Sequence, residues 1–469
     1  MFPVTANELT WETGSEGSNP SLSAARRTYV VREQRIAIHI PARANMRSEA
    51  PQQAPIDASR VARMSTEVRR IDAPELGAWA EQMGIGFHFK PTAGWTEFLR
   101  EQVDLDRTWG AFDGSGVVGT LRSFATELTV PGGSQMNASA LTNVTVAPTH
   151  TRRGLLTKMI RADLAASAER GEVVGILIAS EWPIYGRFGY GPAIYEAKYE
   201  IDSRSMHFLE PSEGRVELVD DGELRKIAPA LYERHRLAQP GTIERLPLWW
   251  DRHLHQVDVP GEKPDESRNA VYRGPSGDAE GYVRYKPKQE WEAMLPKGSM
   301  SMDELLALTP RAYRELWRYC CGVDLLTKIE AGNRPVDEPL AFFVTDGRAV
   351  KQASRHDLIW VRVLDVPTAL ARRSYSVEGR LVIEVSDDLG YASGTFLLEG
   401  GPDGATCERT DAEPDLQCSV SVLGSIYMGG SSTAAIATAG LVSARSDAAV
   451  TTADAMFLTA RSPWCGTWF

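Results

Sequence analysis

The sequence has 469 residues, which is enough for about three domains of ordinary size. Hydrophobic residues make up 43% and charged residues 24%, a globular balance that excludes a mainly disordered or fibrous chain. The 51 Lys and Arg and 62 Asp and Glu give a net charge of −11, so the chain is a poor candidate for binding nucleic acid.

No apolar run approaches the roughly 18 to 20 residues that a membrane span needs, and the first residues do not have the pattern of a secretory signal. The cysteine count is odd and no pair is spaced C-x-x-C, which predicts neither a disulfide framework nor a zinc site. We therefore expect a reducing, cytoplasmic location and no metal. The five cysteines are Cys320, Cys321, Cys407, Cys418 and Cys465.

Residues 1–63 differ from the rest of the chain, because their apolar residues follow no sustained period among Ser, Pro, Gln and Arg. This composition is typical of a disordered extension. The alternative is that translation begins at Met64. The sequence leaves both possibilities open.

From Glu67 the pattern becomes regular. A strand at 67–71 leads to a helix from Pro74 to about Met83, and strands at 109–113 and 116–130 form a hairpin through Gly114-Ser115. A β-branched strand at 140–149 then runs into HTRRGLLTKMIRADLAASAERG (150–171), whose apolar residues recur at helical spacing up to a stop at Gly171. A uniformly apolar strand follows at 173–180.

The turn between strand 140–149 and the following helix is the first candidate ligand site. Gly154 allows a ligand to approach the backbone, and the N–H groups at a helix start can bind phosphate. Arg152 and Arg153 add positive charge. The other interpretation is an ordinary loop-to-helix turn.

A second block at 209–356 repeats this organisation without a glycine-containing phosphate turn. Helices are predicted at 221–239 and 246–256, strands at 269–274 and 281–286, and a strand-turn-helix at 302–322. We interpret it as a degenerate second copy. The third block begins near Leu358, with strands predicted at 358–365, 379–387, 394–400 and 418–430 and a short helix at 366–375.

The segment SEWPIYGRFGYGPA (180–193) places three glycines among Tyr185, Phe188 and Tyr190, directly after a buried strand. Alone it indicates a tight bend with aromatic packing. Taken with NVTVAPTHTRRGLLTKMI (143–160), it resembles the Eis-type (enhanced intracellular survival) N-acetyltransferases of the GNAT superfamily. The resemblance covers about residues 65–469 and extends to the aromatic C-terminal residue, Phe469.

This resemblance implies an α+β fold with two tandem GNAT-like modules followed by a sterol-carrier-protein-like domain. The implied domains are an acetyltransferase domain at 64–208, a degenerate GNAT-like domain at 209–357 and the sterol-carrier-like domain at 358–469. It also implies acetyl-CoA as co-substrate, a primary amine of an aminoglycoside, polyamine or lysine as acceptor, and a homohexamer.

The family's functional positions can be carried over to this sequence. Tyr185 matches the general acid that protonates the departing thiolate, and the carboxylate of Phe469 matches the general base. Trp95, Trp250 and Trp468 match positions in the substrate cleft, although core packing explains Trp95 and Trp250 equally well. The positions that match cofactor contacts are Val144, Thr145, Val146, Arg152, Arg153, Gly154, Leu155, Leu156, Thr157, Ser180 and Glu181.

These roles agree with the chemistry of acetyl transfer. An amine must be neutral to attack a thioester, and aliphatic ammonium groups have a pKa of about 10.4, so a base is useful. A terminal carboxyl has an ordinary pKa of about 3.3 to 3.7, so burial or an ordered water must help it act as that base.

Two residues depart from the family pattern. Thr151 stands where the phosphate signature usually has Gln or Arg, and Trp468 stands where an aminoglycoside-acetylating member has an acidic residue. They motivate a second hypothesis, a coenzyme A-binding or interaction protein that has lost catalysis. A third hypothesis is lipid binding by residues 358–469.

Overall fold

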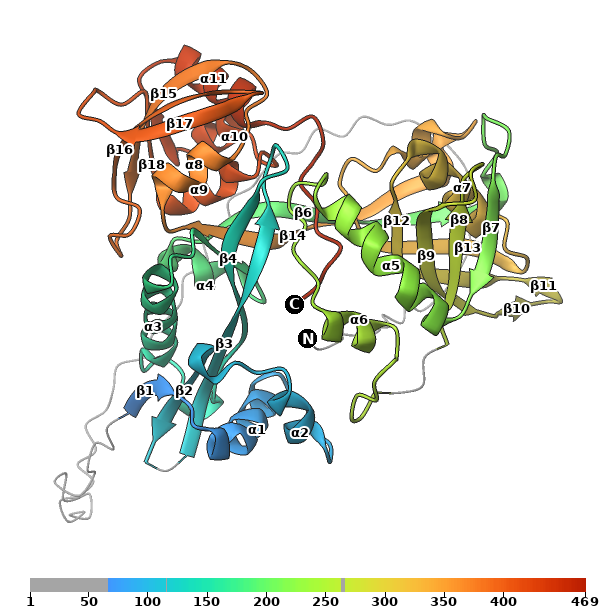
Figure 1. Cartoon of the computed structure of the whole chain (residues 1–469), viewed down its shortest axis with the longest axis horizontal. Helices are drawn as coiled ribbons and strands as arrows, with labels where there is room; N and C mark the ends of the chain where they lie inside the picture. The colour runs from blue at the N-terminus through green and yellow to red at the C-terminus, as the bar shows by residue number, and fades with distance from the viewer. Residues whose placement is uncertain (1–65, 115, 263–265) are drawn as a thin grey trace, which may run out of the picture. The chain divides into compact units, whose positions relative to one another are not determined.

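The computed structural model describes residues 66–114, 116–262 and 266–469 (Figure 1). The extension predicted for residues 1–63 lies outside the described residues. Within them, every helix is too short or too polar to span a bilayer.

The first module (residues 66–202) contains a mixed β-sheet with helices on both faces. Its sheet strands are β1 (Thr66–Arg70), β2 (Thr108–Asp113), β3 (Gly116–Thr129), β4 (Gln135–Val146), β5 (Val174–Ile178) and β6 (Gly191–Asp202). Its helices are α1 (Leu76–Gly86), α2 (Trp95–Arg100), α3 (Leu155–Glu169) and α4 (Trp182–Tyr185). All the strands and helices predicted between 67 and 180 are present.

Helix α3 begins later than the sequence pattern predicted. Residues 150–154 form a turn, because Arg152 and Gly154 have φ angles of 63° and 77°, which a helix does not allow. The helix then buries Leu155, Met159 and Ile160 against the sheet. It ends at Glu169, two residues before Gly171 (φ 74°), so the predicted glycine stop is confirmed.

The second module (residues 215–334) repeats the strand-turn-helix theme and continues the same sheet. Its strands are β7 (Arg215–Val219), β8 (Arg268–Arg273), β9 (Ala279–Lys288), β12 (Gly298–Ala307) and β13 (Leu326–Arg334), with a separate hairpin of β10 (Trp291–Glu292) and β11 (Leu295–Pro296). Its helices are α5 (Asp221–Arg236), α6 (Pro247–His253) and α7 (Pro310–Cys321). The twelve-stranded sheet also includes β14 (Val350–Val363) and has the order β1-β2-β3-β4-β5-β14-β6-β13-β12-β9-β8-β7.

Strand β14 (Val350–Val363) corrects the expected start of the third module. It pairs with β5 along one edge and β6 along the other, so it lies inside the large sheet. Residues 358–363 are all buried, as expected of a central strand with both faces covered. The strand predicted at 358–365 therefore completes the first module's sheet, and the boundary expected at 357/358 falls within β14.

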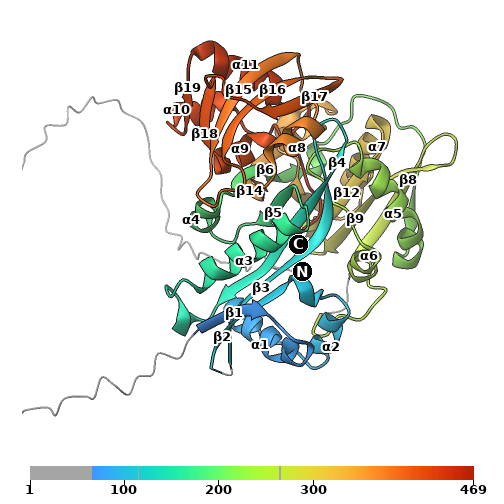
Figure 2. The ribbon, with the colours of Figure 1, turned by 60° about the vertical axis from the view of Figure 1, so that its left-hand side comes forward.

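The third module (residues 366–457) has its own five-stranded sheet, in the order β17-β16-β15-β18-β19, and is drawn in orange and red in Figures 1 and 2. Its strands are β15 (Gly379–Ser386), β16 (Gly394–Gly401), β17 (Gly404–Arg409), β18 (Leu416–Ser419) and β19 (Val442–Ala444). Its helices are α8 (Val366–Arg372), α9 (Val420–Tyr427), α10 (Thr433–Thr438) and α11 (Asp447–Phe457).

The strand predicted at 418–430 is wrong beyond Ser419, because α9 occupies residues 420–427. The Ser419 side chain caps this helix by accepting a hydrogen bond from the Val422 N–H at 3.3 Å. The helix packs on β6 and β14, where Gly424 lies directly against the Val361 carbonyl. Tertiary packing thus outweighs the β-propensity of the Val-Ser-Val sequence.

Candidate active site

The turn before α3 presents free backbone donors. Gly154 is the N-cap residue, and no side chain of the described residues caps the helix. Lys158 is the first residue whose N–H bonds back, to the Gly154 carbonyl at 3.0 Å. The N–H groups of Leu155, Leu156 and Thr157 therefore have no partner within their helix. A Cβ atom on Gly154 would have nothing within 4 Å among the described residues, so the turn is open to an approaching ligand.

The side chains around this turn fix its shape. Asp113 Oδ2 contacts His150 Nε2 at 2.8 Å and lies 3.8 Å from the Arg153 guanidinium. Arg153 also donates to the Thr149 carbonyl at 3.1 Å, and Thr151 donates its hydroxyl to the Pro148 carbonyl at 3.2 Å. Thr151 therefore stabilises the turn itself. The exposed residues 151–154, with two arginines and no acid, suit an anionic group.

Strands β4 and β5 separate in front of this turn. They pair in parallel only from Ala138 to Leu141 of β4, although β4 continues to Val146. Two residues of β4, one of them Asn143 with a φ of 55°, oppose the single residue Leu121 of β3, which forms a β-bulge. Thr120 holds the bulge by donating to the Asn143 carbonyl at 2.8 Å. The edge of residues 144–146 that faces away from β3 is thus not paired with β5.

The two faces of β4 carry different neighbours at this point. Val144 and Val146 pack into an apolar cluster with residues of α3, whereas the Thr145 side chain lies against Gly86 at the end of α1. The same cluster holds Leu155, Leu156 and Tyr185. The structure therefore brings together predicted site residues from the strand, the phosphate turn and the segment after β5.

Tyr185 is the last residue of α4 and is only 5% exposed. Its ring makes an edge-to-face contact with Tyr190 at a centroid distance of 6.3 Å. Burial raises the pKa of Tyr185 to about 12, although a hydrogen bond with Ser180 acts in the opposite direction. The phenol is therefore fully protonated at neutral pH, as a proton donor must be. Ser180 and Glu181 are exposed beside it in sequence.

The C-terminal tail (residues 458–469) reaches the first module. Phe469 is 8% exposed, and its ring contacts Phe124 of β3 edge-to-face with centroids 5.6 Å apart. Figures 1 and 2 both show the C-terminal end beside β3. Trp468 is 40% exposed.

Arg245 of the second module holds this tail. Its guanidinium donates to the Thr467 hydroxyl at 2.7 Å and to the Gly466 carbonyl at 3.0 Å. Glu304 receives a third bond from it at 2.7 Å, and the Tyr282 hydroxyl donates to the other oxygen of Glu304. Each of these contacts is buried or nearly so, and burial makes charge-assisted hydrogen bonds strong.

Two further contacts bind the tail to the second module. The Tyr232 hydroxyl lies 2.8 Å from the Thr467 hydroxyl, and the backbone N–H of Trp464 donates to the Pro240 carbonyl at 2.8 Å. None of these residues was predicted from the sequence as part of the site. Arg245 lies 222 residues before Thr467 and 59 before Glu304, and no local pattern indicates pairing over such separations.

Trp95 and Trp250 both lie in packed aromatic groups. Trp95 is 7% exposed and contacts Phe89 and Phe98, whereas Trp250 is 3% exposed and contacts Tyr232 and Trp249. The Arg252 guanidinium of α6 lies over the Phe98 ring of α2 at 5.7 Å, so the two groups adjoin. The packing interpretation accounts for both rings, and a role in substrate binding stays a prediction.

In the second module, a side chain caps the helix start that corresponds to the phosphate turn of the first module. Helix α7 begins directly after β12, and its N-cap residue Thr309 accepts a hydrogen bond from the Ala312 N–H at 3.1 Å. Thr309 also donates to the Glu280 carboxylate at 2.9 Å. The start of α7 therefore offers fewer free N–H groups to a diphosphate than the turn at Gly154 does.

The fold and the first site define a class of protein. A sheet whose parallel strands separate beside an open helix start is the arrangement of a GNAT acyltransferase, and three parts of the chain match known families. Residues 67–193 and 241–377 each match an acetyltransferase (GNAT) domain, and residues 366–466 match a sterol carrier protein domain.

The chain belongs to the Eis-type N-acetyltransferases. It is 34% identical over 360 residues to N-acetyltransferase Eis of Mycobacterium tuberculosis, covering 74% of this chain and 85% of that one. It is 40% identical over 407 residues to an uncharacterized N-acetyltransferase of Streptomyces avermitilis, covering 85% and 97% of the two chains. The crystal structure of Eis1 from Mycobacterium abscessus matches with a TM-score of 0.77 and 36% identity, over 86% of this chain and all of that one.

The chain is therefore an N-acetyltransferase with two GNAT domains followed by a sterol-carrier domain, as predicted. The GNAT fold implies acetyl-CoA as co-substrate and an amine as acceptor. The open turn at Gly154 and the unpaired edge of β4 fit a diphosphate and an extended pantetheine arm. Among the described residues, no group of three or more His, Cys, Asp or Glu is placed to hold a metal ion.

Proposed function

We propose that the chain transfers acetyl from acetyl-CoA to a primary amine in a ternary complex, with Tyr185 as general acid and the C-terminal carboxylate of Phe469 as general base. The observation that carries this proposal is the burial of the chain end on β3, where a segment from the far end of the sequence meets the acetyltransferase module.

The proposed residue roles rest on the family resemblance, and the surroundings of these residues support them. The turn at 152–157 and the edge at 144–146 hold the co-substrate, and Ser180 and Glu181 contribute further contacts. Tyr185 gives its proton to the departing thiolate, and the Phe469 carboxylate takes a proton from the amine. Free N–H groups along β4 would stabilise the developing oxyanion without rearranging.

We propose that the acceptor is an aminoglycoside, a polyamine or a lysine ε-amine. Trp468 presents an aromatic surface beside the chain end, and an aromatic ring attracts a cation through its face. The second candidate is a coenzyme A-binding protein without catalysis, and the capped helix start of the second module favours it, because it indicates that this scaffold can lose a ligand site.

Coenzyme A release from acetyl-CoA distinguishes the two candidates. The protein, with its natural C-terminus, is assayed against a panel of aminoglycosides, polyamines and lysine peptides. We expect release that depends on the amine and acetylated product in stoichiometric amount. Acetyl-CoA binding by calorimetry without release from any amine of the panel would favour the non-catalytic candidate.

We further propose a cytoplasmic homohexamer. All five cysteines lie in the described part of the chain as free thiols, which suits a reducing compartment. The β10–β11 hairpin exposes Trp291, Met294 and Leu295, and such apolar surface is typical of a protein interface. The mass in solution from light scattering tests the hexamer.

The variant Thr467→Val tests whether the hydrogen bond from Arg245 to the tail positions the chain end. Valine keeps the shape of threonine but leaves the Arg245 Nε–H without its acceptor, which should lower the free energy of unfolding by about 1 to 3 kcal/mol. Because the chain end lies two residues further on, we expect turnover to fall about tenfold or more at unchanged acetyl-CoA affinity.

Thr108→Val is the matched control. Thr108 is fully buried and donates to the Asp104 carbonyl at 2.7 Å, remote in sequence from the tail. It should lose comparable stability and keep its turnover. Equal turnover losses in the two variants would show that Thr467 acts through stability alone.

A further inference from the structure

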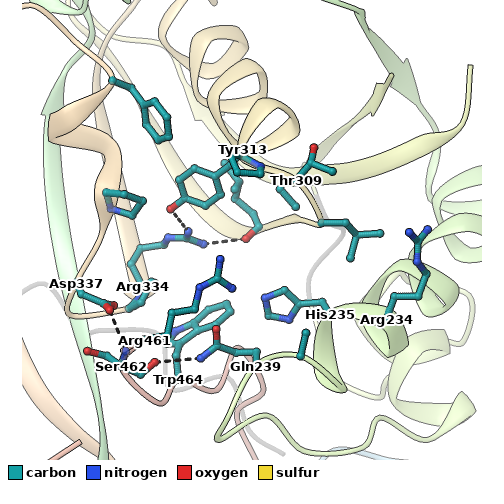
Figure 3. Close-up of a pocket in the computed structure, with 18 residues that line it drawn as sticks. Arg234, His235, Gln239, Thr309, Tyr313, Arg334, Asp337, Arg461, Ser462 and Trp464 are labelled. Atoms are coloured by element: carbon teal, nitrogen blue, oxygen red, sulfur yellow. Dashed lines mark hydrogen bonds between the residues drawn. The ribbon is translucent and has the colours of Figure 1, made fainter. Parts of the chain in front are cut away.

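A pocket of about 550 Å³ lies in the second module, at the carboxyl ends of β12 and β13 (Figure 3). These parallel strands pair only as far as Met302 and Ala331, and beyond that point they separate. The start of α7, the end of α5 and residues 461–464 of the C-terminal tail complete the wall. Its volume is in the range of small-molecule sites.

Within the described part of the chain, two of the arginines that line the pocket have no acidic partner. Arg461 is exposed and projects into the middle of the pocket, between Arg334 and His235, as Figure 3 shows. Arg234 lines the same wall from α5. Neither guanidinium has an ion pair within 4.0 Å among residues 66–114, 116–262 and 266–469.

Two further charged residues around the pocket, Arg334 and Asp337, already have hydrogen-bond partners. Arg334 is 3% exposed and is bound by Glu338 at 3.1 Å, by the Leu305 carbonyl and by the Tyr313 hydroxyl. Asp337 accepts a hydrogen bond from the Ser462 N–H at 2.9 Å. The Asp337 carboxylate keeps its negative charge, but with Arg334 paired to Glu338 and both Arg461 and Arg234 unpaired among the described residues, the wall retains a net positive charge in a chain whose net charge is −11.

His235 supplies a second polar group. Its Nδ1 atom is buried and has no hydrogen-bond partner within the described part of the chain, and its ring meets Trp464 edge-to-face at 5.8 Å. Burial lowers the pKa of His235 to about 4, and the positive charges of Arg461, Arg245 and Arg334 act in the same direction. A neutral imidazole can donate one hydrogen bond to an anion.

We infer that this pocket binds a small organic anion, a phosphate monoester or carboxylate carried on an apolar body, with Arg461 and Arg234 as its charged contacts. Guanidinium groups suit planar carboxylates and phosphates, and Leu308, Phe343 and Trp464 supply apolar wall for the body. The site is separate from the turn at Gly154 of the first module. It does not depend on the proposed acid and base.

Titration calorimetry with phenyl phosphate tests the inference, in the presence of saturating coenzyme A, which the proposed function places at the turn at Gly154. We expect one phenyl phosphate per chain with coenzyme A bound, and at least tenfold weaker binding by Arg461→Gln. Because Arg461 is exposed, this variant should keep the wild-type melting temperature. Arg380→Gln, which changes an exposed arginine on β15, is the matched control and should bind like the wild type.

Three results would overturn the inference. They are binding that disappears when coenzyme A is present, equal affinity in Arg461→Gln and the wild type, and equal affinity for the uncharged analogue benzyl alcohol. Because the readout is binding, a protein that fails to acetylate any amine could still pass this test.

Discussion

Adding two glycines after Phe469 should lower turnover about 100-fold or more while acetyl-CoA binds as before. The extension moves the terminal carboxylate by up to roughly 7 Å, since each extended residue spans about 3.3 to 3.6 Å. A positioned general base contributes typically about 100- to 10,000-fold. Coenzyme A release measures the turnover, and calorimetry measures the affinity for acetyl-CoA.

Two further variants test whether the loss of turnover comes from moving the carboxylate, from losing the phenyl ring or from adding residues. Deleting Phe469 withdraws the carboxylate to Trp468 without adding atoms, so turnover should again be lost. Phe469→Ala keeps the carboxylate at the end of a chain still held at Thr467 and removes only the contact with Phe124, so it should retain more activity than the deletion. Full turnover by the extended protein would exclude the terminal carboxylate as base.

Much of the fold could be predicted from local pattern. The helical spacing of Leu155, Met159 and Ile160 and the stop at Gly171 depend on neighbours in sequence, and the structure shows both. The family motifs at 143–160 and 180–193 correctly identified two GNAT domains. Strand β14 could not be placed in this way, because its partners β5 and β6 lie more than 140 residues earlier in the chain.

The residues of the candidate site also differ in how well the sequence predicts them. Gly154 could be predicted from its residue type, because a left-handed φ angle before a helix favours glycine. Arg245 and Thr467 carry no such signal, since an arginine two residues before a proline and a threonine near the C-terminus are both common. Asn143 offered a weak signal, as asparagine tolerates the left-handed φ angle of its bulge better than the β-branched residues that follow it.

Tyr185→Phe should lower turnover about 100-fold or more and leave the fold intact. Phenylalanine preserves the ring that is 5% exposed and packs against Tyr190, so the melting temperature should change little. The variant loses the proton that the departing thiolate needs, so the loss should appear in kcat and leave the acetyl-CoA affinity unchanged.

The pH profile and a neighbouring tyrosine make this prediction specific. Because the pKa of Tyr185 is raised to about 12, its proton stays in place as the pH rises, and turnover by the wild type should not fall on the alkaline side until the pH nears that value. Tyr190→Phe removes a hydroxyl from the same apolar cluster and should keep its turnover. If Tyr185→Phe turns over like Tyr190→Phe, Tyr185 packs the site but donates no proton, and another acid must protonate the thiolate.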